Sequence, residues 1–204
     1  MLKKKNHDRD WSNTGSFINK PQRGWLHPDE YLNPSAGVCY GVRYIGAMEV
    51  KQSMKSLDFE TRTALTKEAI GRVCEVAGLK NPTKKTKRSG KVAKMLGDEP
   101  NLVFAGSNVN LTITTDSLTI VVMETGDLVA SHEMPTVSFA SGGDPDTMDF
   151  VAYVAKDTNG RACHVLECGG GLAQDVITTM GQAFELRYKL YLASKTAATS
   201  TPPR

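Results

Sequence analysis

The chain has 204 residues, of which 40% are hydrophobic and 23% charged, and this is enough to build one well-buried domain. No stretch approaches the roughly 18 apolar residues of a membrane-spanning helix, and the lysine-rich start lacks the apolar core of a secretion signal. We therefore expect a soluble, cytoplasmic protein. The spacing of its four cysteines fits no zinc-finger pattern, so we interpret them as buried free thiols and predict neither a metal nor a cofactor.

The two ends of the chain differ from its middle in composition. Residues 1–14 are polar and show no sustained period, and residues 194–204 are rich in Ala, Thr, Ser and Pro. Such segments cannot bury enough apolar surface to fold. We expect a disordered arm at 1–14, one domain at 15–193 and a disordered tail at 194–204.

A strand and a helix are the first predicted elements of the domain. The stretch 38–50 alternates apolar residues as a long strand does, and Arg43 lies on the face opposite its main apolar series. Residues 58–77 carry apolar positions at helical spacing, with Asp58 as a capping residue and Gly78 as the residue that ends the helix.

A basic stretch follows this helix. Seven cations and no acidic residue occur between Lys80 and Lys94, although the net charge of the whole chain is only +3. An exposed loop of this kind suits an acidic membrane surface, while a solvated loop or a nuclear-import-like stretch is the plainer interpretation. Nucleic acid is not an expected partner, because no aromatic residues are interleaved for base stacking. The candidates for lipid contact are Lys84, Lys85, Lys87 and Arg88.

Four short strands are predicted next, each separated from its neighbour by turn residues. Their apolar positions recur with the period of two that half-buried antiparallel strands show. The predicted strands lie at 101–105, 108–114, 117–123 and 127–133.

Three further strands, at 136–141, 148–156 and 162–168, are split by turn residues. Asn159-Gly160 is a strong hairpin signal, and a hairpin closed there brings Lys156 close to Arg161. Two cations then share one corner of a sheet with only Asp157 between them. Such a corner favours an anionic partner.

The last predicted element is a helix at 172–192, entered through three consecutive glycines. It has more apolar surface than one core-facing stripe requires, and one of its stripes contains Met180 and Phe184. That stripe either faces a ligand groove or lies deep in a core, and the pattern alone does not choose between the two.

These elements together predict an α+β fold, with about seven antiparallel strands in a sandwich or barrel and a helix that closes one end. No catalytic motif accompanies the residues that resemble a nucleophile and its base, so we do not expect an enzyme. Those residues are Ser138, His132, His164 and Cys163.

Several long strings of the sequence resemble one family closely. They include GSFINKPQRGWLHPDE, VRYIGAMEV, QSMKSLDFETRTALTKEAI, SFASGGDPDTMDFVAYVAKDTNGRACHVLEC and GLAQDVITTMGQAFELRYKLYL. Over roughly residues 15–192, the chain is similar to the phosphotyrosine-binding (PTB) domain of the Shc adaptor protein family. The resemblance implies a fold like that of pleckstrin-homology domains, with two near-orthogonal antiparallel sheets capped by the C-terminal helix. It also implies binding of Asn-Pro-x-phosphotyrosine peptides with an apolar residue five positions before the tyrosine.

The resemblance also implies roles for individual residues. The phosphotyrosine-binding residues it gives are Arg43, Ser138, Lys156 and Arg161, and the wall of the pocket for the upstream apolar residue is formed by Met180 and Phe184. We expect the strand around Val137 to leave one edge free beside the final helix, so that an extended peptide adds to it as another strand. The groove residues on that strand are Thr136, Val137, Phe139 and Ala140.

We therefore expect a monomeric adaptor module in receptor tyrosine kinase signalling, recruited from the cytoplasm to the plasma membrane by tyrosine-phosphorylated receptor tails. The alternative is a phosphoinositide-binding or acidic-membrane-binding module that acts through the basic loop at 80–94.

Overall fold

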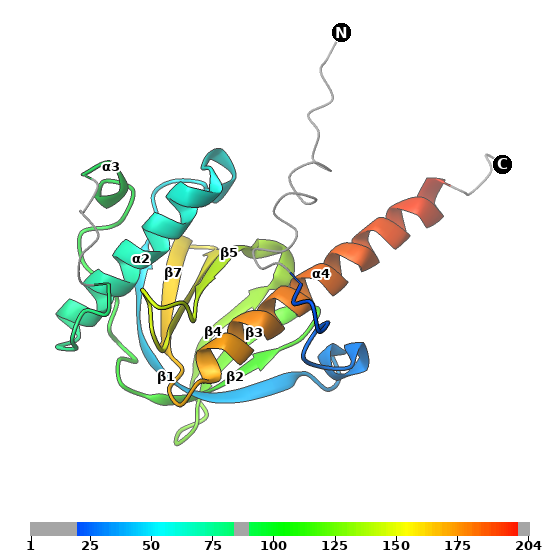
Figure 1. Ribbon diagram of the computed structural model, residues 1–204, viewed down its shortest axis with the longest axis horizontal. Helices are drawn as coiled ribbons and strands as arrows, with labels where there is room; N and C mark the ends of the chain where they lie inside the picture. The colour runs from blue at the N-terminus through cyan, green and yellow to red at the C-terminus, as the bar shows by residue number, and fades with distance from the viewer. Residues whose placement is uncertain (1–19, 84–89, 200–204) are drawn as a thin grey trace, which may run out of the picture.

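A computed structural model describes residues 20–83 and 90–199. Its seven strands form one antiparallel sheet in the order β4-β3-β2-β1-β7-β6-β5, with two longer helices packed on it (Figure 1). The expected arm at 1–14 and the four lipid-contact candidates at 84, 85, 87 and 88 lie outside the described residues. The strands are β1 (Val38–Glu49), β2 (Asn108–Ile113), β3 (Ser117–Val122), β4 (Leu128–Glu133), β5 (Val137–Gly142), β6 (Phe150–Asp157) and β7 (Gly160–Glu167). The helices are η1 (Asp29–Leu32), η2 (Met54–Ser56), α2 (Phe59–Val76), α3 (Gly90–Ala93), η3 (Met134–Thr136) and α4 (Leu172–Thr199).

Strand β1 joins the two halves of the sheet. Its residues 38–43 pair with β2, whereas residues 43–49 pair with β7, and the register shifts between Tyr44 and Gly46. A side chain at Gly46 would approach the Asn101 carbonyl oxygen to 2.9 Å, so glycine permits the close contact at this irregularity. The predicted α+β fold is confirmed, with a helix after the first strand and a long helix at the end. The two predicted sheets are the halves of one continuous sheet, β2–β4 and β5–β7, which β1 joins.

Two separate cores explain why β6 is buried along most of its length. One core fills the interior between the two half-sheets and is closed by α4, and the other lies between the outer face of β5–β7 and α2. Successive residues of β6 alternate between them: Val151 and Tyr153 belong to the interior core, and Ala152 and Val154 belong to the α2 core. A strand covered on both faces needs apolar residues at every position.

Helix α2 matches its prediction closely. It runs from Phe59 to Val76, and the Asp58 carboxylate accepts a hydrogen bond from the Thr61 backbone N–H at 2.7 Å. This bond satisfies one of the free amides of the first turn and lowers the pKa of Asp58. The helix therefore begins where the capping signal placed it.

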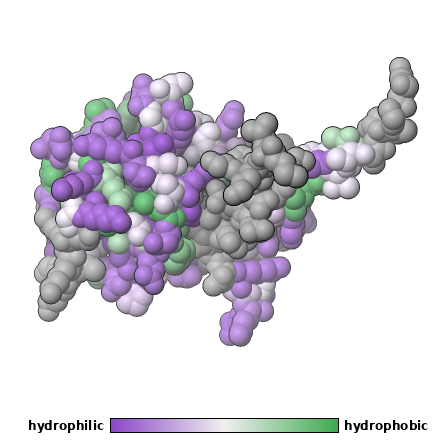
Figure 2. Space-filling view, turned by 90° about the horizontal axis from the view of Figure 1, so that it is seen from above, coloured by the Kyte–Doolittle hydropathy of each residue, from purple (hydrophilic) through white to green (hydrophobic). Residues whose placement is uncertain are grey.

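Two predictions about secondary structure are wrong. The expected strand at 101–105 is reduced to an isolated bridge between Asn101 and Ala47, because the Asn101 side chain accepts a hydrogen bond from the Val103 N–H and starts a turn. The final helix continues to Thr199 instead of ending at 192, so most of the tail expected to be disordered is helical. Alanine and lysine, which are good helix formers, support this exposed extension, which projects beyond the body of the domain (Figures 1 and 2).

Among the described residues, no helix is both long and apolar enough to cross a membrane. The same part of the chain contains no group of three or more histidine, cysteine, aspartate or glutamate side chains placed to hold a metal ion.

Candidate functional site

Strand β5 is at one end of the sheet and has one free edge. It pairs with β6 alone, and its other side faces no strand of the described chain. Helix α4 packs beside it, so the free edge lies next to a helix wall. A sheet edge of this kind can accept an extended peptide through main-chain hydrogen bonds.

A shallow groove of about 180 Å³ lies between this edge and the helices. Ala140, Ser141 and Gly142 of β5 form its floor, and Gln174 and Ile177 of the first two turns of α4 form one wall. Aromatic rings close the other side: Phe59 at the start of α2 meets Phe139 edge to face, with ring centroids 5.9 Å apart. The groove can therefore receive an apolar side chain from a segment lying along β5.

Ser138 occupies a β-bulge at the start of β5. Val137 pairs with Ala155 and Phe139 with Val154, so Ser138 is an extra residue without a partner on β6. Its hydroxyl donates a long hydrogen bond of 3.3 Å to the Val154 carbonyl oxygen. The bulge also turns Val137 into the interior core and Phe139 into the α2 core, so these two side chains lie on opposite faces of the sheet.

The predicted hairpin between β6 and β7 is present. Lys156 and Arg161 are direct cross-strand partners, and the Asp157 carboxylate accepts a hydrogen bond from the Asn159 N–H that shapes the turn. Directly opposed residues of an antiparallel pair project from the same face. Because Ala155 faces the interior core, Lys156 and Arg161 project from the outer face of the sheet. The Ser138 hydroxyl lies two residues before Lys156, at the Val154 carbonyl oxygen.

Arg43 does not join this group. It lies opposite Glu167, at the other end of β7 from Arg161, and its Nε donates to the Glu167 carboxylate at 2.6 Å. Six residues of strand separate these ends, or about 20 Å at roughly 3.4 Å per residue. The prediction that Arg43 shares a phosphate site with Lys156 and Arg161 is therefore wrong in this structure.

A lysine that the sequence reasoning assigned no role lies in a better position. The Val50 N–H donates to the Arg161 carbonyl oxygen at 2.9 Å, so the connection from β1 to α2 leaves the sheet beside the hairpin. The η2 turn in this connection packs against β5 through the buried Met54, and Lys55, the next residue, is exposed. Ser138, Lys156, Arg161 and Lys55 thus come from four elements, β5, β6, β7 and η2, that meet at one corner. The sequence signal was a lysine in the connection between a strand and a helix, whose place depends on tertiary packing.

Some of the other residues predicted to line the groove lie outside it. Met180 and Phe184 belong to the interior core and do not line the groove, whereas Ile177, a residue of the same core one turn before Met180 on α4, does line it. Thr136 precedes β5 as the last residue of η3, and its hydroxyl donates to the Glu133 carbonyl oxygen at 2.7 Å. Of the residues predicted on β5, Phe139 and Ala140 line the groove.

Known protein families and curated proteins match most of the chain. The model of the family described as phosphotyrosine interaction domain (PTB/PID) matches residues 40–194. The chain is 54% identical over 185 residues to SHC-transforming protein 1 of Xenopus laevis, with 90% of this chain and 40% of that protein covered. It is 52% identical over 198 residues to SHC-transforming protein 2 of Homo sapiens, with 96% of this chain and 34% of that protein covered.

These relatives are much longer proteins, and the chain spans 40% or less of their length. The predicted resemblance to the domain of Shc adaptors is confirmed. Because the family match covers most of its residues, the chain belongs to the phosphotyrosine interaction domain (PTB/PID) family.

Proposed function

We propose that the chain is a non-catalytic module that binds tyrosine-phosphorylated Asn-Pro-x-Tyr segments in the tails of activated receptors. The peptide adds as a strand to the free edge of β5, and its phosphate is held by Ser138, Lys156, Arg161 and Lys55. The observation that carries the proposal is the position of a cation pair, the exposed Lys156 and the half-buried Arg161, at one end of a sheet edge that has a groove at its other end.

The charges at this corner suit a phosphate. A phosphotyrosine carries about −1.5 to −2 charges and three strong acceptor oxygens, so it needs several converging donors. The planar guanidinium of Arg161 can bond two oxygens at once, whereas Lys156 and Lys55 act as mobile point charges. We infer that Arg161 sets the orientation of the phosphate and that the lysines contribute mainly attraction.

The dimensions also support this arrangement. Gly142, which lines the groove, lies four positions after Ser138 on β5, or about 14 Å away at roughly 3.4 Å per residue. A residue five positions before a tyrosine lies up to about 17 Å from it in a fully extended chain, and less where the chain turns. A peptide with its phosphotyrosine at Ser138 thus places that upstream residue at Ile177. In this arrangement the peptide runs antiparallel to β5.

Fluorescence polarisation with a labelled peptide tests the proposal. We expect the phosphorylated peptide to bind at least about tenfold more tightly than its unphosphorylated form, because each charge-assisted hydrogen bond contributes about 1.5–3 kcal/mol. Replacing the upstream apolar residue by serine should weaken binding of the phosphorylated form. Equal affinity for the phosphorylated and unphosphorylated peptides would refute phosphotyrosine recognition.

The lipid alternative for Lys84, Lys85, Lys87 and Arg88 stays a prediction. The same peptide titration, repeated with these four residues replaced by glutamine, separates it from peptide binding. A loss of binding to anionic vesicles with unchanged phosphopeptide affinity assigns the basic loop to lipid alone.

A further inference from the structure

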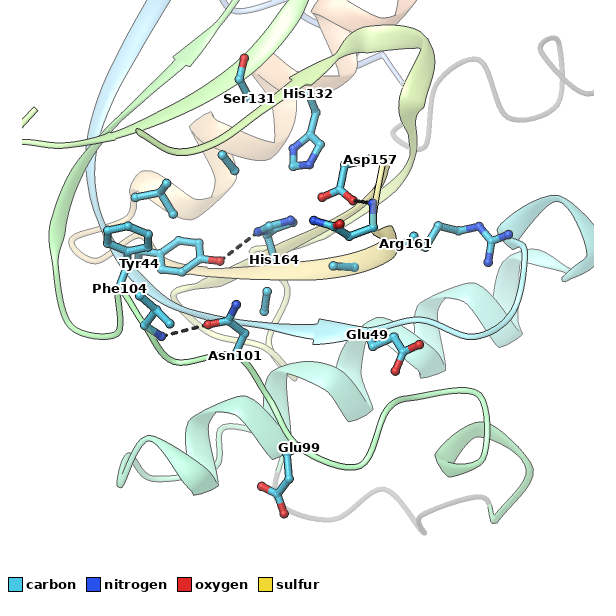
Figure 3. A pocket seen from close by; sticks show the side chains of 17 residues that line it. Tyr44, Glu49, Glu99, Asn101, Phe104, Ser131, His132, Asp157, Arg161 and His164 are labelled. Carbon is cyan, nitrogen blue, oxygen red and sulfur yellow. Dashed lines mark hydrogen bonds between the residues drawn. The ribbon is translucent and has the colours of Figure 1, made fainter. Parts of the chain in front are cut away.

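A second cavity, of about 480 Å³, lies between the two halves of the sheet (Figure 3). Its lining comes from β1, from β4, from the hairpin of β6 and β7, and from the segment at 99–104, and it includes no residue of α4. The cavity is therefore separate from the groove beside β5. Apolar contact surface is available on its walls from Phe104, Val129 and Ala130.

His164 is the central polar group of this cavity. The residue is 7% exposed, and its Nδ1 lies 2.9 Å from the Tyr44 hydroxyl oxygen. Tyr153 stacks on the imidazole with centroids 5.1 Å apart, and the His132 ring lies 4.9 Å away, so the orientation of the ring is fixed. Its Nε2 is buried and has no hydrogen-bond partner in the described chain.

The protonation of this pair decides what Nε2 offers. Burial raises the pKa of the Tyr44 phenol. Burial is also the largest cause that lowers the pKa of His164, to about 3. Both groups are therefore neutral near pH 7. We assign the Tyr44 hydroxyl as the donor to Nδ1, which places the proton of the neutral imidazole on Nε2. An unpaired buried N–H of this kind is costly, and an acceptor atom placed in the cavity removes that cost.

The charges around the cavity have one predominant sign. Glu49, Glu99 and Asp157 line it, and none of the three makes an ion pair with another described residue. Arg161 is the cation in the lining, and its Nη1 lies 3.4 Å from the Val50 carbonyl oxygen, with the side chain directed away from His164 (Figure 3). With the histidine neutral, the lining carries more negative than positive charge. Cations are therefore favoured here, and phosphates are not.

We propose that this cavity binds a small organic cation that carries a hydrogen-bond acceptor. Its ammonium or guanidinium group lies near the carboxylates of Glu49 and Glu99 at the rim, and its apolar body contacts Phe104 and Val129. Its acceptor oxygen receives the hydrogen bond from His164 Nε2. The proposal does not depend on phosphopeptide binding at β5.

A set of three matched compounds tests this inference by NMR titration of the ¹⁵N-labelled domain. The probe is 4-(aminomethyl)benzamide, which combines an ammonium group, an aromatic ring and a carboxamide oxygen. Its neutral and anionic analogues are 4-methylbenzamide and 4-carboxybenzamide. We expect the cation to bind about fivefold or more tightly than the neutral analogue, as one charge interaction of about 1 kcal/mol gives, and the anion to bind most weakly. Saturable shifts should include the His164 ring.

Variants assign the binding to the cavity. Glu49→Gln with Glu99→Gln should remove the preference for the cation, and Glu60→Gln, an exposed carboxylate on α2, is the matched control that should keep it. His164→Phe keeps the ring and removes the donor, so it should weaken all three compounds, with a thermal melt to confirm folding.

Two outcomes would overturn the inference: equal binding of the three compounds, or a double glutamine variant that behaves like the Glu60→Gln control. Phosphopeptide affinity, measured on the same variants, should be unchanged. If the phosphopeptide fails to bind the wild-type domain while the cation binds, only the function proposed for β5 fails.

Discussion

The two ends of β7 carry arginines in opposite electrostatic states. At one end Arg43 lies across from Glu167, and the two side chains form an ion pair. At the other end Arg161 lies across from Lys156, and it makes no ion pair with any described residue. A strand arginine is therefore available to a ligand only where its cross-strand neighbour does not neutralise it.

The same difference separates the structural role of Arg43 from the binding role proposed for Arg161. The Arg43–Glu167 pair links two neighbouring strands and leaves little net charge. The Lys156–Arg161 pair repels itself, and like charges directly opposite each other destabilise a sheet. An incoming phosphate relieves that repulsion, so part of the cost of keeping two cations together is recovered on binding.

The largest expected effect of breaking this contrast comes from Arg161→Ala. We expect phosphopeptide affinity to fall about 10- to 100-fold, because about 1.5–3 kcal/mol is lost with hydrogen bonds to a charged group. The phosphopeptide affinity of Arg161→Lys should lie between those of Arg161→Ala and the wild-type domain, since lysine keeps the charge but lacks the planar fork. Fluorescence polarisation measures both, and thermal melting checks that loss of the bond to Val50 leaves the domain folded.

The contribution of Lys55 is the next smaller effect. Lys55→Ala should weaken phosphopeptide binding about two- to fivefold, since a single exposed charge contributes up to about 1 kcal/mol. Lys51→Ala is the matched control: Lys51 is exposed on the same connection, but its backbone N–H donates to Met95, away from β5. Equal losses from both variants would show a general effect of positive charge and remove Lys55 from the site.

Acidification offers a milder test of the phosphate. Between pH 7.5 and 5 the phosphate loses most of its second charge, because its second pKa is about 6, and we expect a few-fold loss of affinity that Arg161→Ala largely abolishes. Isothermal titration calorimetry across this range measures it. A pH-independent affinity in the wild-type domain would contradict charge recognition at the hairpin.

Stability also changes in this pH range and must be followed in parallel. Burial lowers the pKa of His132 and lowers that of His164 to about 3, so the unfolded chain, with histidine pKa values near 6.5, takes up these protons first. The stability of the domain is therefore lost as the pH falls from about 6.5 toward 3. Thermal melts at each pH show at which pH values the domain is still folded, so that a change in affinity there reflects binding and not unfolding.

Local signals made the hairpin end of the site predictable from the sequence. Asn159-Gly160 sets a short turn, and the register of a short hairpin follows from its turn, so the opposition of Lys156 and Arg161 needed no knowledge of the rest of the fold. The start of α2 was predictable for the same reason, since Asp58 and Thr61 are three residues apart.

Features of the site that depend on long-range packing could not be predicted from the sequence. The partner of Arg43 is 124 residues away, and only the pairing of β1 with β7 brings Glu167 opposite it. The position of Lys55 likewise depends on how η2 packs on β5. The bulge at Ser138 adds one residue to β5, and alternation along a six-residue strand does not indicate it.

The smallest expected effect concerns the neutralised end of β7. Because the side chains of Arg43 and Glu167 are 39% and 31% exposed, a double-mutant cycle with Arg43→Ala and Glu167→Ala should give a coupling free energy of only about 0.2–1 kcal/mol in chemical denaturation. Phosphopeptide affinity should change less than about twofold in either variant, since neither residue belongs to the phosphate site proposed at the hairpin. The contrast between the two arginines fails if Arg43→Ala weakens binding as much as Arg161→Ala does. In that case the ligand would have to separate Arg43 from Glu167, and Glu167→Ala would strengthen binding by freeing the arginine.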